Sequence, residues 1–326
     1  MSLVKQVGLK EIAYALNVST NTVSRALRDC DDISEETKQK VRIKAIEMGY
    51  SPNNVEEYVK KGMKRNIAFV GNGFVNQYYM VMCNELISFL DTEKYDFNVV
   101  ISKNEYLNSN DMKRCILQRI DGIITFMEPT PEACEIAKLY GLPVMLIGRH
   151  ISNNSIDQIY TDDYLGGQLA GQYLIETLGC KRLTYLTFEN VECSSRRYYG
   201  FLSISQKYNL PVDLIYVKDK NNIDVDDLIS KQYDGIFCFS DELAYLLLYK
   251  ASCNEEKDEN FKNVHLVGYD ALAHRIRGLK RITSINSNYH DIAKYAIETM
   301  CKHLSCPKDE IEYEEKCFPV KLYRRH

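Results

Sequence analysis

The chain has 326 residues, which suits two or three domains and is too long for one small core. Hydrophobic residues make up 45% and charged residues 26%, which excludes a disordered chain. No apolar run reaches the ~18 residues of a membrane helix, and no charged-then-apolar leader is present. The eleven cysteines contain no C-x-x-C pair, so we expect a cytoplasmic protein with reduced thiols, no metal site and no membrane contact.

Charge is distributed unevenly along the chain. The overall net charge of −4 does not indicate a nucleic-acid binder. Residues 1–65, however, carry 12 Lys and Arg against 9 Asp and Glu, a net charge of +3 that leaves −7 for the rest. A basic head on an acidic body suits a DNA-binding module joined to another unit.

Two short helices joined by a tight turn are predicted near the N-terminus. The apolar face of the first helix follows the spacing i, i+3, i+4, i+7 and consists of Leu9, Ile12, Ala13 and Leu16. Asn17 predicts an abrupt end to this helix, because asparagine tolerates a left-handed backbone. Ser19 can cap the second helix, whose inward positions are Val23, Ala26 and Leu27. Helices so closely joined form a helix-turn-helix, whose second helix can enter the major groove.

A third helix is predicted from the stretch "ISEETKQKVRIKAIEMGY". Ser34 is a suitable N-cap, and the two glutamates that follow favour the positive end of a helix. The inward stripe of this helix is formed by Val41, Ala45 and Met48. The first fifty residues therefore predict a small three-helix domain.

Four segments of this region resemble the lactose-repressor/galactose-repressor family of bacterial transcription regulators. They are "LKEIAYALNVSTNTVSRAL", "ISEETKQKV", "MGYSPN" and the basic run that follows. The pattern V-S-x-x-T-V-S-R, then S-E-E-T, then G-Y-x-P-N is specific at these spacings. The resemblance implies an N-terminal all-α helix-turn-helix DNA-binding domain at residues 1–51, a hinge helix and linker at 52–65, and an effector-binding and dimerisation domain at 66–326.

The resemblance implies DNA contacts for the polar face of the second helix. Thr20 and Asn21 fall where the family reads base edges, and Arg25 falls where an arginine contacts guanine. Phosphate contacts are expected for Ser19, Thr22, Ser24 and Arg28. Asn53 is also expected to contact DNA. The alternative, most open for Ser24, is a helix face that only meets solvent.

The stretch "YSPNNVEEYVKKGMKRN" matches the family's hinge. Val59 occupies the position of the leucine that relatives wedge into the minor groove, and Val55 falls where two hinges touch. Glu56 and Glu57 replace residues that are commonly Ala-Arg or Ala-Gln in relatives. The two carboxylates either repel phosphates and weaken hinge engagement, or face water and favour the helix N-terminus while nearby lysines supply the attraction.

The remainder of the chain alternates short apolar strands with helical stretches. The predicted strands are "IAFVG", "FNVVIS", "DGIITF", "PVMLIG", "QIYTD", "LTYLTF", "LIYV", "GIFCFS" and "VHLVGY". This alternation predicts parallel sheets covered by helices on both faces. The resemblance implies a periplasmic-binding-protein-like α/β domain of two doubly wound parallel-sheet lobes, joined by three crossings. The N-lobe would span about 66–161 and 289–320, and the C-lobe about 162–288.

An aromatic pair is expected in the cleft between the lobes. The family has Asn-Pro-Phe-Phe where this chain has Asn76, Gln77, Tyr78 and Tyr79. Tyrosine keeps the stacking face and adds a hydroxyl, which suits a sugar-like or other polar ring ligand. The alternative is that both tyrosines only pack the floor of the cleft.

Further effector contacts follow from matching segments of the family. "RRYYGF" places Arg197 where a guanidinium grips the effector, and "VGYDA" makes Asp270 the expected hydroxyl acceptor. "CFSDELA" places Ser240 and Asp241 at the cleft, and "YTDDYLGG" places Asp163 there. Helix capping is the alternative for Asp163 and Asp241.

The sequence thus predicts a sequence-specific transcriptional regulator of the repressor type, with no catalytic residues and no cofactor. It would bind a pseudo-palindromic double-stranded DNA operator as a homodimer under allosteric control by a small molecule, expected to be a carbohydrate. Alternatives are a purine-type co-repressor-dependent regulator and a solute-binding receptor of the same two-lobed fold. An oxidoreductase is disfavoured because the third position of its Gly71-x-Gly73 fingerprint is Asn76.

Overall fold

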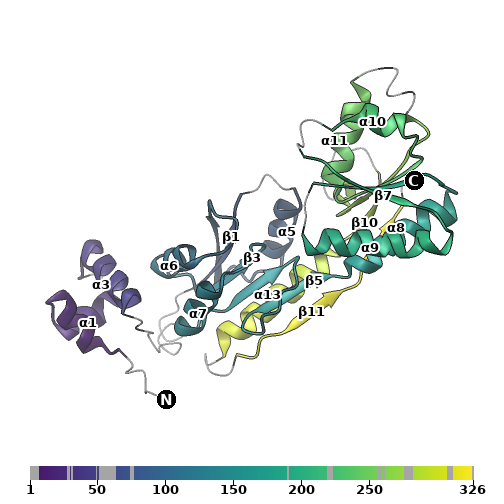
Figure 1. Cartoon of the computed structure of the whole chain (residues 1–326). Helices are drawn as coiled ribbons and strands as arrows, with labels where there is room; N and C mark the ends of the chain where they lie inside the picture. The colour runs from purple at the N-terminus through teal and green to yellow at the C-terminus, as the bar shows by residue number, and fades with distance from the viewer. Residues whose placement is uncertain are drawn as a thin grey trace, which may run out of the picture.

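The computed structural model contains a three-helix N-terminal unit and two α/β lobes (Figure 1). It describes residues 7–27, 30, 32–48, 50, 64–73, 77–188, 191–218, 223–253, 255, 259, 261–274, 282–306 and 311–324. Several positions with a predicted role lie outside these residues, namely Arg28, Asn53, Val55, Glu56, Glu57, Val59 and Asn76.

The N-terminal unit contains α1 (Leu9–Leu16), α2 (Thr20–Leu27) and α3 (Glu35–Glu47). Asn17 ends α1 in the left-handed conformation with φ 53°, as predicted. The predicted apolar stripes form one core, with Ile12, Val23 and Val41 buried at its centre. Met48 and Leu27 pack against its edge. The helix-turn-helix prediction is therefore confirmed, and its local capping signals are sufficient to explain it.

The N-lobe is built on a six-stranded parallel sheet in the order β11-β5-β4-β3-β1-β2. Its strands are β1 (Arg65–Gly71), β2 (Tyr95–Ile101), β3 (Gly122–Thr125), β4 (Val144–Ile147), β5 (Asp157–Thr161) and β11 (Glu315–Phe318). Helices α5 (Gln77–Ser88) and α13 (Tyr289–Ser305) share one core beside the sheet, and α6 (Ser109–Leu117) and α7 (Pro131–Tyr140) share another. The register sets Phe69 opposite Val99 and Ile124.

The C-lobe repeats this plan with the strand order β12-β10-β9-β8-β6-β7. Its strands are β6 (Leu183–Thr187), β7 (Val212–Tyr216), β8 (Gly235–Cys238), β9 (His265–Tyr269), β10 (Thr283–Asn286) and β12 (Lys321–Tyr323). Its helices are α8 (Asp163–Gly171), the π-helix η1 (Gln172–Thr177), α9 (Glu192–Lys207), α10 (Val225–Ser230), α11 (Asp241–Ser252) and the 3-10 turn η2 (Leu272–His274). Only β12 runs antiparallel among these strands, with Leu322 opposite Ile285.

The chain passes between the two sheets three times, after β5, after β10 and after β11. Two of these crossings are bonded to each other, since the Asp162 amide donates to the Phe318 carbonyl at 2.9 Å.

The strands β10, β11 and β12 were not predicted, because they are short and partly polar. β12 joins the C-lobe sheet although the predicted lobe boundaries leave residues 321–323 unassigned.

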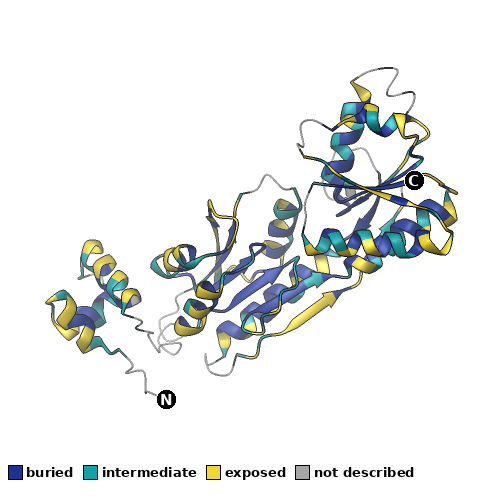
Figure 2. Cartoon of the chain, viewed as in Figure 1, coloured by how far each residue is buried: buried dark blue, intermediate teal, exposed yellow. Residues whose placement is uncertain are grey.

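Both lobes bury their central strands and the sheet-facing sides of their helices, whereas the edge strands β2, β7, β11 and β12 are more exposed (Figure 2). The C-lobe core is continuous across both faces of its sheet. Within the described part of the chain, no helix is both long and apolar enough to cross a membrane. Two doubly wound lobes of this kind place the ends of their strands toward the crossings, where ligands commonly bind.

Candidate functional site

The exposed face of α2 carries the residues predicted to read DNA. Thr20 and Asn21 are exposed at the start of the helix. Ser19 caps it, because the Thr22 amide donates to the Ser19 Oγ at 2.9 Å. The two hydroxyls of Ser19 and Thr22 also lie 2.8 Å apart. Arg25 follows one turn later and pairs with Asp32 in the loop after α2.

The centre of the second candidate site is the buried guanidinium of Arg197, on α9. Its Nε donates to the Asp163 Oδ1 at 2.8 Å, and its Nη1 donates to the Phe239 carbonyl at 2.6 Å. Its Cζ lies 3.4 Å from the centre of the Tyr269 ring and 4.8 Å from that of Phe239. Opposite charge and two aromatic faces thus stabilise a cation that is only 8% exposed.

Asp163 and Asp241 do not cap their helices, because the residue before each of them is the N-cap. Asp162 caps α8, because its carboxylate accepts from the Leu165 amide at 3.0 Å. Ser240 caps α11, because its hydroxyl accepts from the Leu243 amide at 3.4 Å. Asp163 is therefore available to pair with Arg197, and it does not act as the helix cap that was its alternative role.

Close packing of α8 on α9 brings Asp163 to Arg197. A Cβ at Gly167 would lie 2.0 Å from the Arg197 carbonyl oxygen, and a Cβ at Gly200 would lie 2.0 Å from the Tyr164 carbonyl oxygen. Both contacts are with backbone atoms, which cannot rotate away as a side chain can. Glycine at these two positions is what permits the helices to cross at this distance.

Asp270 lies in an unusual backbone turn after β9. Its φ is 97° and that of Ala271 is 51°, conformations that side-chain-bearing residues rarely adopt. The Asp270 amide donates to the Ile285 carbonyl at 2.7 Å, and the Ser287 hydroxyl donates to the Asp270 carboxylate at 3.3 Å. These contacts fix the buried carboxyl beside the crossing that follows β10.

Asp241 holds this turn in place. Its Oδ2 accepts from the Leu272 amide at 2.7 Å, and its Oδ1 accepts from the Ser284 hydroxyl at 2.6 Å. Ser284 in turn accepts from the Ala271 amide at 2.9 Å. Asp241 is fully buried, and it holds the turn directly through Leu272 and indirectly through Ser284 on β10, so we propose that it positions Asp270. This differs from the predicted role as a direct effector contact.

Burial raises the pKa of the Asp270 carboxyl from 3.8 to about 6, and Arg197 and Ser287 offset part of that rise. Because the pKa is higher in the folded protein, this group's stabilising contribution is complete below pH 3.8 and is lost as pH rises through about 6.

Asp270→Asn should remove this pH-dependent loss of stability. We expect the variant to gain ~1.4 kcal/mol over the wild type as pH rises from about 5 to about 8, measured by urea denaturation. A stability difference that stays constant over this range would contradict the assignment.

The predicted tyrosine pair joins an aromatic cluster in the N-lobe. The Tyr79 ring stacks on Phe126 with centroids 4.3 Å apart and planes 9° apart. Tyr78 packs at 5.4 Å from Phe126 and at 5.1 Å from Tyr289. Burial raises the pKa of Tyr78, and the nearby Asp270 carboxyl raises it further. The N-lobe aromatics therefore lie near the charged groups of the C-lobe.

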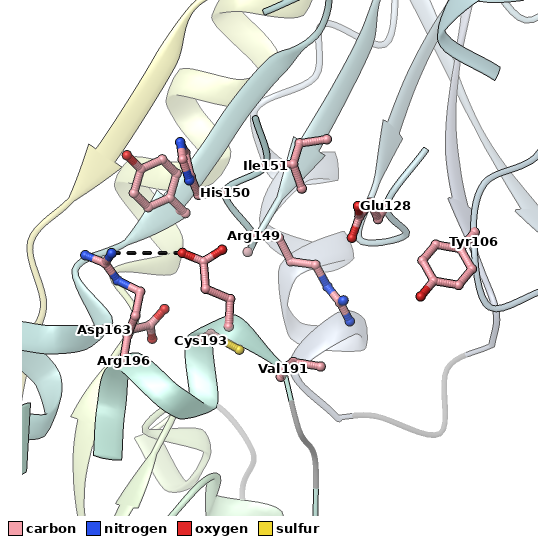
Figure 3. A pocket seen from close by; sticks show the side chains of 12 residues that line it. Tyr106, Glu128, Arg149, His150, Ile151, Asp163, Val191, Cys193 and Arg196 are labelled. Atoms are coloured by element: carbon pink, nitrogen blue, oxygen red, sulfur yellow. Dashed lines mark ion pairs between the residues drawn. The ribbon is translucent and has the colours of Figure 1, made fainter. Parts of the chain in front are cut away.

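A cavity of about 210 Å³ opens between the lobes (Figure 3). On the N-lobe side it is lined by residues that follow the strand ends, including Tyr106, Glu128 and Arg149. On the C-lobe side it is lined by the start of α9, where Arg196 pairs with Glu192 at 4.0 Å. Asp163 lines this cavity and also contacts Arg197, so it connects the cavity to the buried Arg197 site.

Two family profiles match the chain. The first, "Bacterial regulatory proteins, lacI family", matches residues 8–53, and the second, "Periplasmic binding proteins and sugar binding domain of LacI family", matches residues 79–234. The chain belongs to the lacI family. It is accordingly a DNA-binding transcription regulator, from a family of regulators and not of enzymes.

Relatives of this lacI-family protein match it along almost the entire chain. The sucrose operon repressor of Pediococcus pentosaceus is 26% identical, over 97% of this chain and 98% of its own. The transcriptional repressor PurR of Vibrio parahaemolyticus is 24% identical, over 96% and 95%. The family resemblance predicted from the sequence is confirmed.

Solved structures share the fold. A lacI-family regulator from Enterococcus faecium with bound ribose matches with a TM-score of 0.67 at 23% identity, covering 80% of this chain and 97% of that one. The lac repressor dimer bound to operator and an anti-inducer matches with a TM-score of 0.62 at 16% identity, over 98% of each chain. The predicted fold class, a helical head with two mainly parallel α/β lobes, is confirmed.

Sequence reasoning missed several groups in the cleft of this lacI-family protein. Phe239 and Tyr269 each immediately precede a predicted contact, and Phe126 lies at the end of a predicted strand. Ser284 lies on a strand that was not predicted at all. Aromatic residues at the carboxyl ends of predicted strands were the signal available for the first three.

Proposed function

We propose that this lacI-family protein is a repressor whose operator affinity is controlled by a neutral, hydroxylated small molecule bound between its lobes, a sugar or a sugar derivative. The observation that carries this proposal is the ion pair between Arg197 and Asp163. The guanidinium charge is already balanced inside the protein. An anionic ligand placed at this guanidinium would therefore meet the nearby carboxyls of Asp163 and Asp270 beside a cation that is already paired.

A polyol meets none of these costs. Carboxylate oxygens accept hydrogen bonds from hydroxyls, and aromatic rings such as those of Tyr78 and Phe126 pack against the apolar face of a sugar ring. The cavity of about 210 Å³ adjoins these groups through Asp163 and is itself lined by Tyr106, Glu128 and Arg149 on the N-lobe side. Relatives of the same fold were crystallised with bound ribose and with cellobiose.

Control of DNA binding follows from the two-lobed design. The effector changes operator affinity only through different affinities for two arrangements of the lobes, one of which suits the spacing of the DNA-binding heads. The three crossings between the sheets are the segments about which the lobes would move. The protein would act in the cytoplasm, where two heads of a homodimer bind the two halves of a pseudo-palindromic operator.

The direct test combines ligand binding with DNA binding by the full chain. Binding of ribose, sucrose and cellobiose is measured by calorimetry, with a sugar phosphate and adenine as the charged and purine alternatives. Gel shifts on genomic fragments then report whether a bound compound changes DNA affinity. Calorimetric binding of a neutral sugar with a shift in DNA affinity supports the proposal. Binding of only the sugar phosphate or only adenine would overturn it.

The proposed homodimer has a suitable surface at equivalent edges of the two sheets. β2 ends the N-lobe sheet and exposes Val99 and Ile101, and β7 ends the C-lobe sheet and exposes Leu214 and Tyr216. Apolar side chains on exposed sheet edges favour association with another chain.

Val99→Asp is expected to convert the dimer to a monomer at micromolar concentration, because it places a charge in the proposed apolar interface. Operator affinity should fall at least tenfold, since two linked heads bind two half-sites with a higher effective concentration than separate heads. Sedimentation velocity measures the first effect and gel shifts the second. Leu139→Asp, on the similarly exposed surface of α7, is the matched control and should remain dimeric. A dimeric Val99→Asp variant would exclude β2 from the interface.

A further inference from the structure

A carboxylate from outside the recognition helix holds the arginine predicted to read guanine. The Arg25 Nη2 lies 2.5 Å from the Asp32 Oδ2, and the Arg25 Nε donates to the Asp32 Oδ1 at 3.2 Å. Two donors on one edge of the guanidinium therefore meet the two oxygens of one carboxylate. This bidentate geometry fixes the plane of the guanidinium as well as its position.

The loop that carries Asp32 is itself anchored. The Cys30 amide donates to the carbonyl of Arg25 at 3.0 Å, and the Ile33 amide donates to the Cys30 carbonyl at 3.1 Å. Ile33 packs against the core of the three-helix unit. Ser34 caps α3 by accepting from the Thr37 amide at 3.3 Å. Neighbours on both sides of Asp32 are thus bonded to the helices, and they determine where its carboxylate lies.

The contacts with Asp32 involve only one edge of the guanidinium. An arginine has five N–H donors, and the Nε–Nη2 edge faces Asp32. The Nη1–Nη2 edge also presents two parallel donors, which match the O6 and N7 acceptors of guanine in the major groove. One side chain can therefore contact Asp32 through one edge and a guanine through the other.

We propose that Asp32 is a specificity-determining residue, which positions the Arg25 guanidinium so that its second edge reads guanine. This inference depends on the guanine-reading role proposed for Arg25. An arginine that is oriented before DNA binds loses less conformational freedom at the interface. The adjacent carboxylate also repels phosphates, so it favours base reading by Arg25 over contact with the DNA backbone.

The test measures discrimination between base pairs by the full chain. The wild type first selects its preferred duplex from a randomised duplex pool, and each base pair of that duplex is then replaced in turn. Dissociation constants are measured for the wild type, Arg25→Ala, Asp32→Asn and the double variant, with a random-sequence duplex for comparison. Glu47→Gln is the matched control, since it removes a carboxylate of the same domain that pairs with Lys44 on α3.

We expect Arg25→Ala to lose discrimination at one G·C pair of each half-site. Asp32→Asn should lose about tenfold of the discrimination at that same pair, and little at the others. Its affinity for the random duplex should be equal to or higher than that of the wild type, because a carboxylate near phosphates has been removed. In the double variant, Asp32→Asn should have no additional effect on discrimination. Glu47→Gln should discriminate as the wild type does.

Three outcomes would overturn the proposal. Full discrimination by Arg25→Ala would remove its premise, independently of Asp32. Full discrimination by Asp32→Asn, with tighter binding to the preferred duplex, would mean that Asp32 competes with guanine for the arginine. An equal loss of affinity for every duplex would mean that Asp32 only maintains the domain, which circular dichroism of the variant would also detect.

Discussion

Replacing Arg197 with methionine is expected to cost about 3–5 kcal/mol of unfolding free energy, because it leaves Asp163 buried without a counter-charge. The two side chains are 9% and 6% exposed, so water can do little to stabilise the remaining carboxylate. The variant also loses the hydrogen bond to Phe239 and the contact with the Tyr269 ring. Urea denaturation measures the cost, and effector binding should be abolished in parallel.

Arg196→Met is the matched control for this prediction. Arg196 is adjacent in sequence, but its side chain is 46% exposed and its partner Glu192 lies 4.0 Å away. Exposed pairs of this kind contribute ~1 kcal/mol or less. Combining Arg197→Met with Asp163→Asn should recover most of the lost stability, since the uncompensated charge is then absent. Equal losses for Arg197→Met and Arg196→Met would contradict the role given to the buried pair.

Gly167→Ala is expected to destabilise the C-lobe by ~3 kcal/mol or more, at the upper end of the cost of overpacking. The new methyl group would lie 2.0 Å from the Arg197 carbonyl oxygen, so α8 and α9 must move apart. That movement also separates Asp163 from Arg197. The loss should appear despite the ~1 kcal/mol that alanine gains over glycine inside a helix. Thermal unfolding and effector calorimetry on the same preparation measure both consequences.

Gly171→Ala provides the comparison on the same helix. Its added Cβ would approach the side chains of Ile204 and Phe201 at 3.0 and 3.1 Å, distances that small shifts can relieve. We expect a loss of ~1 kcal/mol or less and retained effector binding. If the two alanine variants were equally stable, backbone proximity would not be what requires glycine at position 167.

The sequence predicted those parts of the protein that depend on short-range signals. Asn17 ends α1 and Ser19 caps α2, and each acts within a few residues of its own position. The alternation of apolar strands with helices likewise predicted parallel sheets covered by helices, and the family resemblance implied that there are two such lobes. The strands β10, β11 and β12 were not predicted, because their own sequences show too little apolar alternation. Their place in the sheets depends on pairing with strands that are distant in sequence, as β11 pairs with β5.

The roles of the acidic residues were decided by tertiary structure. Asp162 and Asp163 are adjacent and chemically identical, yet one caps α8 and the other pairs with Arg197. Asp241 lies in a segment that resembles an effector contact, but one of its oxygens binds the loop after Asp270 and the other binds Ser284 on β10. The partner of a carboxylate depends on which helix or turn packs against it.

By itself, the sequence determined the family, the helix-turn-helix and the lobe architecture, because these follow from local periodicity, capping and motif spacing. Only the tertiary structure decided that the charge of Arg197 is balanced by Asp163 and that Arg25 is held by Asp32. The physical reason is that an ion pair depends on the distance between two side chains in space. For Arg197 the glycine-permitted crossing of α8 and α9 sets that distance, and for Arg25 the anchored loop before α3 sets it.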